Sequence, residues 1–214
     1  KPKSKCLFHS RRSSGVGHCR HYILKENKMA TIKGLHAFLI KEQFRKAMEA
    51  KGYAFFGLEN KAAYNVNIIG VRSDEDIFNE FDDALVVIYR DKKKNWEVRS
   101  YSITTDPGKI WMEKPMNSKG CAILVPDQYR GVYKIDGHGK TRYEALCQRG
   151  GEVSVYRDAN LDHEHDRDAG TITTGNYGIN IHRSRSTGES ELVNSYSAGC
   201  QVFKNASDFK DFMK

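Results

Sequence analysis

Near its C-terminus the chain reads Tyr177-Gly178-Ile179-Asn180-Ile181-His182, then a polar loop over residues 183–194, then Ser195-Tyr196-Ser197-Ala198-Gly199-Cys200-Gln201-Val202-Phe203. In the first segment two isoleucines alternate with polar residues, which predicts a strand with His182 on the face opposite the isoleucines. The glycine-containing loop is able to bring the second segment back alongside the first. The two segments therefore predict one site that contains His182 and Cys200.

A cysteine that follows a glycine turn and precedes a strand suits nucleophilic catalysis. The thiolate is the reactive form, and a nearby imidazole such as His182 lowers the pKa of the Cys200 thiol and later protonates the leaving group. Gly199 allows close backbone approach, so amide groups of this turn are candidates for an oxyanion hole. Ser197 is a candidate for orienting the histidine or for donating to the substrate. The competing interpretation is a buried core thiol and an unrelated structural histidine.

This arrangement resembles the catalytic domain of the L,D-transpeptidases, the YkuD family. The family motif is a histidine, typically in Ile-His-Gly, followed a dozen or more residues later by Ser-x-Gly-Cys-hydrophobic-Arg. The matching residues are Ile181, His182, Ser197, Gly199 and Cys200. Arg183 replaces the motif glycine and Gln201-Val202 replaces the hydrophobic-Arg pair, so the family's recognition of a substrate carboxylate is not carried over.

The resemblance implies a β-sandwich-like fold and an acyl-enzyme on Cys200, formed with the stem peptide of peptidoglycan and requiring no cofactor. Water then gives cleavage and an amine gives a crosslink. Segments 105–108 and 122–126, together with the motif, also resemble uncharacterised bacteriophage proteins, which favours a wall-degrading hydrolase in the cytoplasm of an infected bacterium or in the virion. The candidate substrate-binding residues beside the motif are Tyr177, Asn180 and Arg183.

Outward from the motif, residues 81–214 predict a mainly β domain of the α+β class, largely antiparallel. Strands are expected at residues 84–90, 96–104, 121–125, 131–135, 143–147, 152–156, 177–182 and 199–203. The charged run 91–95 predicts a hairpin loop between the first two strands. Asn205 is a candidate cap for a short C-terminal helix whose Phe209, Phe212 and Met213 face inward.

Residues 29–80 predict a helical N-terminal lead-in. A helix is expected near residues 34–51, and Gly52 is placed just past its end. Its apolar face consists of Ile40, Phe44, Ala47 and Met48. The polar run 73–76 predicts the start of a second helix.

The net charge of +8 is concentrated in one segment. Residues 1–28 hold eight basic residues and one acid, whereas the rest of the chain holds 27 basic and 26 acidic residues. The body therefore has no basic bias, which argues against a nucleic-acid partner. Codons for the run 25–28, directly before Met29, can spell a ribosome-binding site, so we interpret residues 1–28 as a non-native or disordered leader. The alternative is a genuine basic tail.

The cysteine spacing bears on redox state and metal binding. The five cysteines are Cys6, Cys19, Cys121, Cys147 and Cys200, and no CxxC spacing occurs among them. This argues against a zinc site and a disulfide framework, and a reduced compartment is simpler than a Cys121–Cys147 pair. No apolar run reaches the roughly 18 residues of a membrane span.

Two further segments have two interpretations each. The candidate calcium ligands are Asp158, Asn160, Asp162 and Glu164, which alternate as in the first half of a calcium loop. His163 and Ala169 replace the glycine and the last glutamate of an EF-hand, so the loop is either a structural calcium site or a solvated acidic turn. Residues 129–133, with His138, Lys140 and Arg142, either line a substrate cleft or form a strand with solvated charges.

Two other classes of function stay open. One is a non-catalytic phage structural or wall-binding protein with a decayed YkuD-like fold. The other is a calcium-dependent interaction module.

Overall fold

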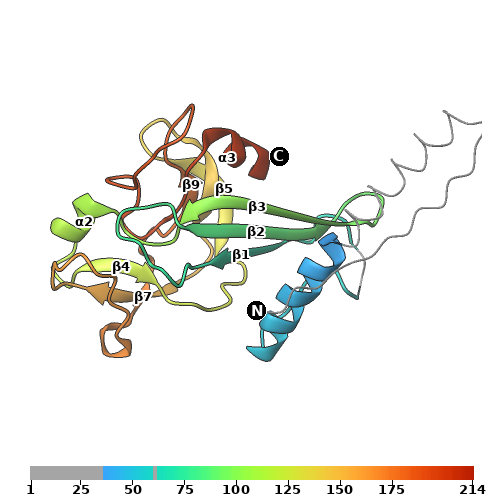
Figure 1. Ribbon diagram of the computed structural model, residues 1–214, viewed down its shortest axis with the longest axis horizontal. Helices are drawn as coiled ribbons and strands as arrows, with labels where there is room; N and C mark the ends of the chain where they lie inside the picture. Colours follow the sequence, from blue (N-terminus) through green and yellow to red (C-terminus); the bar gives the residue numbers. More distant parts are fainter. Residues whose placement is uncertain (1–35, 60–61) are drawn as a thin grey trace, which may run out of the picture.

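The computed structural model describes residues 36–59 and 62–214, so the predicted leader over residues 1–28, with Cys6 and Cys19, lies outside the described residues. Within these ranges the chain is mainly β, as predicted, with one seven-stranded and one three-stranded sheet and a few short helices (Figure 1). None of the described helices has the length and apolar character that crossing a bilayer requires.

The larger sheet has the strand order β1-β2-β3-β10-β9-β6-β5. Its strands are β1 (Asn67–Val71), β2 (Asp83–Arg90), β3 (Trp96–Thr104), β10 (Gln201–Phe203), β9 (Ile181–Arg183), β6 (Tyr143–Gln148) and β5 (Tyr133–His138). The smaller sheet consists of β4 (Cys121–Leu124), β7 (Val153–Asp158) and β8 (Thr173–Gly175). The helical segments are residues 36–50, α2 (Lys109–Glu113), η1 (Ala169–Thr171) and α3 (Ala206–Phe212).

The β2–β3 hairpin is the longest strand pairing and confirms the prediction from the sequence. All eight residues of β2 pair with β3, from Asp83 opposite Ile103 to Arg90 opposite Trp96. The charged loop closes through the N–H of Asp91, which donates to the carbonyl of Asn95 at 2.9 Å. Alternating side chains of β2 therefore pack into two hydrophobic cores, one on each face of the sheet.

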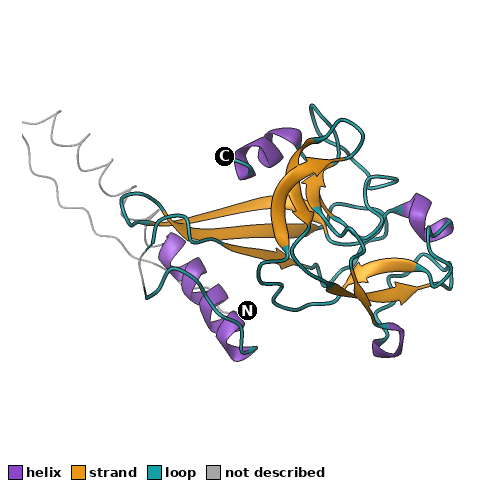
Figure 2. Ribbon diagram, turned by 180° about the vertical axis from the view of Figure 1, so that it is seen from behind, coloured by secondary structure: helices purple, strands orange, loops and turns teal. Residues whose placement is uncertain are grey.

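One core lies between the large sheet and α3 (Figure 2). Phe203 of β10 is fully buried and packs against Phe209 of α3, with ring centroids 5.4 Å apart. Asn205 caps α3 as expected, because its side chain accepts the N–H of Ser207. The core on the other face takes Phe44 and Met48 from the N-terminal helix, which ends before Gly52 at φ +75°.

Strands β9 and β10 pair in parallel, whereas every other strand pair in the described ranges is antiparallel. A parallel pair needs a crossover of about a dozen residues or more. The polar segment 184–200 supplies this crossover, and it returns Cys200 beside Asn180. The prediction of a returning loop is confirmed, and the parallel pairing of the returning strand is new.

Three details of the sequence prediction are wrong. Residues 73–76 do not start a helix, because the N–H of Ser73 donates to buried Asp83 and that of Glu75 donates to the Ser73 hydroxyl. The lead-in is not wholly helical, because β1 pairs along its whole length with β2. The strands expected at 177–182 and 199–203 are reduced to β9 and β10, because the N–H of Ile179 donates to the Gln148 side chain and that of Gly199 to the Ser197 hydroxyl instead of to a strand.

Gly199 brings the two sheets together. It has φ +117°, and a Cβ built on it would lie 2.2 Å from the carbonyl oxygen of Ala122 in β4. Only glycine fits a left-handed backbone position in such close contact. The turn before Cys200 is therefore held against the smaller sheet.

We predict that Gly199→Ala lowers the free energy of unfolding by about 3 kcal/mol or more, because it adds backbone strain to a backbone clash. Gly188→Ala is the matched control, since Gly188 also has positive φ (+68°) but open space around it. We expect the control to lose about 1 kcal/mol. Urea denaturation compares the two, and equal losses would contradict the role of the Ala122 contact.

Candidate active site

Cys200 lies directly before β10, in the crossover turn, and is partly exposed. Its sulfur accepts the N–H of Asn180 at 3.4 Å and lies 3.5 Å from the carbonyl oxygen of Gly178. Cys121 and Cys147 are buried, and all three described cysteines are free thiols. Cys200 is thus the most accessible of the three.

His182 occupies the middle of β9 and is only 6% exposed. Its Nδ1 lies 2.9 Å from the carbonyl oxygen of Arg183. Because a carbonyl oxygen only accepts, Nδ1 carries the proton and Nε2 carries the lone pair. His182 therefore has the tautomer of a general base.

The strand register relates His182 to Cys200. Val202 is opposite His182 and Gln201 is opposite Ile181, so Cys200 is the diagonal neighbour of His182 across the parallel pair. Continued by one residue beyond β10, the strand alternation puts the Cys200 and His182 side chains on the same face. No hydrogen bond joins the two side chains within the described ranges; the thiol contacts backbone groups instead.

Burial keeps both groups uncharged. Burial, together with the smaller effect of the neighbouring His138, lowers the pKa of His182 to about 4. Although part of Cys200 is exposed, desolvation of its thiol raises the pKa to about 11, against a smaller opposing effect of the Asn180 N–H. The expected lowering of the thiol pKa by the histidine does not occur in this resting state, because no contact with His182 offsets the desolvation.

Ser197 supports the turn and does not contact His182. It is fully buried, its hydroxyl donates to the carbonyl of Cys200 at 2.8 Å, and it accepts the N–H of Gly199 at 3.1 Å. A hydroxyl has one proton to donate, so none is left for the substrate. The Gly199 N–H is likewise engaged, whereas the N–H of Cys200 has no partner within the described ranges.

Asn180 and Gln148 form the support behind the site. Both are buried, and the side chain of Asn180 accepts the N–H of Gln148 at 2.8 Å. The side chain of Gln148 accepts the N–H of Ile179 and donates to the carbonyls of Gly151 and Gly175. The predicted substrate-binding role of Asn180 does not agree with these contacts, because its amide is already used within the protein.

The other two candidate substrate residues lie at the edges of the site. The Arg183 guanidinium stacks over the Tyr143 ring at 4.1 Å, and the Arg157 guanidinium over the Tyr177 ring at 4.5 Å. Both candidates are partly exposed. They are therefore oriented by cation–π contacts and remain accessible to a ligand.

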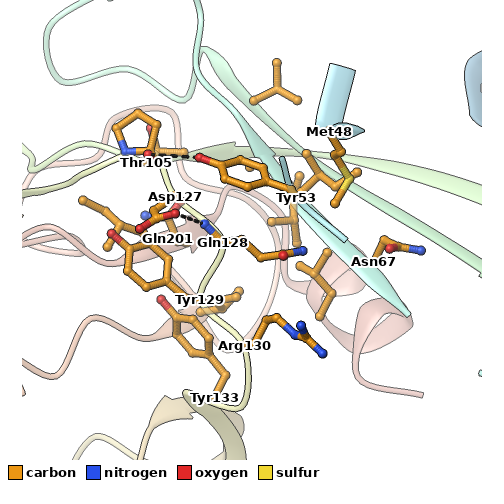
Figure 3. Close-up of a pocket in the computed structure, with 18 of the residues that line it drawn as sticks. Met48, Tyr53, Asn67, Thr105, Asp127, Gln128, Tyr129, Arg130, Tyr133 and Gln201 are labelled. Atoms are coloured by element: carbon orange, nitrogen blue, oxygen red, sulfur yellow. Dashed lines mark hydrogen bonds between the residues drawn. The ribbon is translucent and has the colours of Figure 1, made fainter. Parts of the chain in front are cut away.

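A cavity of about 1010 Å³ lies between β1 and the segment 124–131 (Figure 3). Ile181 and Gln201 line it, whereas His182 and Cys200, at the alternate positions, do not. Gln201 is 5% exposed, and its side-chain nitrogen has no partner among the described residues. The cavity thus adjoins the β9–β10 pair on the face away from the thiol. Its lining includes Tyr129 and Arg130, which the sequence predicted to line a substrate cleft.

Asp76, Asp106 and His165 form the one cluster of three potential metal ligands found among residues 36–59 and 62–214. Arg167 donates to both carboxylates, and Arg72 donates to Asp106 at 3.3 Å. A metal ion there would compete with two guanidinium groups. We therefore interpret the cluster as an ion-pair network that joins three loops.

The proposed calcium ligands bond one another and the backbone. Asn160 donates to the carboxylates of Asp162 and Asp166 at 2.8 and 2.7 Å, and Asp162 accepts the N–H of Glu164. Asp158 is 3% exposed and accepts the N–H of Asp166. These contacts are those of a self-supported acidic turn, and calcium binding stays a prediction.

Comparisons of the chain with protein-family models, with curated proteins and with solved structures find no match. The resemblance to the YkuD family therefore depends on the motif residues alone.

Two residues of the site have weak sequence signals. Gln148 is an isolated polar residue at the end of a strand, and no neighbouring motif indicates that it supports the site. His138 lies in an Asp-Gly-His-Gly run that reads as a turn, yet its ring stacks on His182 with centroids 4.1 Å apart. Both depend on long-range pairing, which local sequence does not display.

We predict that the protein loses stability on acidification between pH 6.5 and 4. The unfolded state binds a proton at His182 in this window, whereas the folded state, with a pKa of about 4, does not. Stability from this group is therefore complete above pH 7 and lost as the pH falls. The loss is about 3 kcal/mol at about 1.4 kcal/mol per pH unit. Urea denaturation at several pH values measures the free energy of unfolding. Between pH 6.5 and 4 this free energy should fall less steeply with pH for His182→Gln than for the wild type; an equal pH dependence would contradict the burial effect.

We also predict that iodoacetamide alkylates Cys200 slowly at pH 7.5, about 300-fold more slowly than a free cysteine of ordinary pKa. The rate should rise about tenfold with each pH unit up to pH 10, because the thiolate fraction rises by the same factor. Peptide mapping by mass spectrometry follows each cysteine separately. Cys121 is the internal reference, because burial raises its pKa to about 12. Rapid, pH-independent alkylation near pH 7 would instead indicate a preformed thiolate.

Proposed function

We propose that this protein is a cysteine-dependent acyl-transfer enzyme that acts on peptidoglycan stem peptides. The single observation that supports the proposal is the parallel β9–β10 register, in which Cys200 is the diagonal neighbour of His182. The hydrogen bond of His182 Nδ1 to the Arg183 carbonyl leaves Nε2 with the lone pair. The motif resemblance to the YkuD family supplies the substrate class.

In the proposed reaction, His182 Nε2 accepts the thiol proton as the Cys200 sulfur attacks the substrate carbonyl carbon. The imidazolium then returns this proton to the departing amine, and an acyl-enzyme remains. Attack by water releases a shortened peptide, whereas attack by an amine forms a crosslink. Since the resting thiol is neutral, the proton transfer accompanies attack and does not precede it.

In this proposal the N–H of Cys200 donates a hydrogen bond to the oxyanion that forms during attack. The Gly199 N–H is occupied by Ser197, and the N–H of Cys200 is unpartnered within the described ranges. Gly199 and Ser197 thereby act on the shape of the turn and not on the substrate. A donor held in a rigid turn stabilises developing charge without reorganisation.

Hydrolysis is favoured over crosslinking because of the resemblance to bacteriophage proteins. A phage wall-degrading enzyme would act from the infected cytoplasm or from the virion. In this proposal the partly exposed side chains of Arg183 and Tyr177 contact the stem peptide.

The second candidate is a non-catalytic wall-binding protein with a decayed site. The observation that favours it is the raised pKa of Cys200, together with the missing thiol–imidazole hydrogen bond among the described residues. Such a protein would bind wall material with an unreactive thiol.

We predict that the wild type converts purified muropeptides to products with a shortened stem, and that Cys200→Ala lowers the rate by about 1000-fold or more because the nucleophile is lost. His182→Gln should lower it by about 100-fold or more, because the base is lost. Mass spectrometry of the digest identifies the bond cleaved, and intact-protein mass shows the acyl-enzyme.

Cys121→Ala is the matched control, because it removes a buried thiol outside the site. Full turnover by Cys200→Ala would end the enzyme proposal. Co-sedimentation of wild type and Cys200→Ala with sacculi, without turnover by either, would establish the wall-binding alternative.

A further inference from the structure

A second imidazole lies flat against the proposed base. His138 is the last residue of β5, and its ring stacks on that of His182 with centroids 4.1 Å apart and planes inclined by 22°. The two residues are 44 positions apart in the sequence, and the sheet order separates their strands by β6. The stack is therefore a product of the tertiary structure.

The hydrogen bonds define the protonation of His138. The backbone N–H of Gln148 is an unambiguous donor to the side-chain oxygen of Asn180, so the Asn180 amide nitrogen faces His138 Nδ1 at 3.2 Å. An amide nitrogen only donates, so Nδ1 of His138 accepts and carries no proton. Neutral His138 consequently carries its proton on Nε2.

The two stacked rings thus hold opposite tautomers. His182 is protonated on Nδ1 through the Arg183 carbonyl, and His138 on Nε2 through Asn180. A protonated His138 would put an N–H group against the Asn180 amide, and two adjacent imidazolium ions would repel each other. The pair therefore accepts one proton at most.

The charged and titratable groups around the two rings are Asp136, Arg142, Tyr143, Arg149, Arg183 and Cys200. Asp136 is paired with Arg149 at 2.7 Å and with Arg142 at 3.6 Å. Tyr143 meets His138 edge-on at 5.5 Å and carries no charge at neutral pH. No described carboxylate is paired with either ring, so the surroundings favour neutral imidazoles.

We propose that His138 is a positioning residue for His182: its stacked ring holds the base in the orientation in which Nδ1 keeps its bond to the Arg183 carbonyl and Nε2 stays free to accept the Cys200 proton. This role rests on the proposed function, since the base has a task only if Cys200 is a nucleophile. It adds His138 and its Asn180–Gln148 support to the residues that determine the site.

Nitrogen-15 NMR of histidine side chains tests the positioning without any need for activity. In the wild type we expect His182 as the pure Nδ1–H tautomer. His138→Ala removes the ring, so His182 should become a mixture of tautomers with a raised pKa. His138→Phe keeps a flat ring for stacking and should keep the wild-type tautomer.

Kinetics of muropeptide turnover supply the second readout. His138→Ala should lower kcat by about 10- to 100-fold with little change in KM, because a misplaced base affects the chemical step and not binding. His138→Phe should restore most of this loss and move the acidic limb of the pH profile. His163→Ala is the matched control, since His163 stacks on Phe78 at 4.6 Å outside the site and should leave both readouts unchanged.

The NMR and kinetic readouts distinguish failure of the positioning role of His138 from failure of the proposed enzyme function. An unchanged His182 tautomer and pKa in folded His138→Ala would overturn the positioning role, whatever the activity. A changed tautomer in a protein whose wild type has no turnover would support the positioning and end the proposed function.

Discussion

Strands β9 and β10, each three residues long, pair in parallel near the centre of the seven-stranded sheet, and this pairing sets where Cys200 lies relative to His182. The pairing joins β9, which contains His182, to β10, which begins directly after Cys200. Because parallel strands cannot be joined by a tight turn, the crossover must leave and return. The return is held by Gly199 against Ala122 and by the hydroxyl of Ser197.

Burial around this pair has two opposite consequences. It orders His182 and its neighbours without using charge, and it deprives the resting thiol of the stabilisation that a thiolate needs. The polar groups behind the site are satisfied through Gln148 and Asn180, so the burial does not leave them unpaired. The candidate site is therefore neutral at rest, and the proposed reaction requires that a bound ligand change the environment of the thiol.

Local patterns in the sequence account for much of the fold. The alternation in β2 and β3, the charged hairpin between them and the Asn205 cap of α3 are all visible in short windows, because each depends on neighbours in the chain. The run 73–76 misleads for the same reason. Its polar residues suit a helix start locally, but Asp83 of the next strand accepts the N–H of Ser73, and Arg167, 91 positions away, binds Asp76, so the segment forms a turn.

The sequence alone determined that the chain is mainly β and that the segment with Cys200 returns beside the segment with His182, because strand alternation and a glycine turn are local properties of the backbone. Only the tertiary structure decided the parallel register, the high pKa of Cys200 and the stack of His138 on His182. These features arise from strand order and from desolvation, and both depend on residues far apart in the chain.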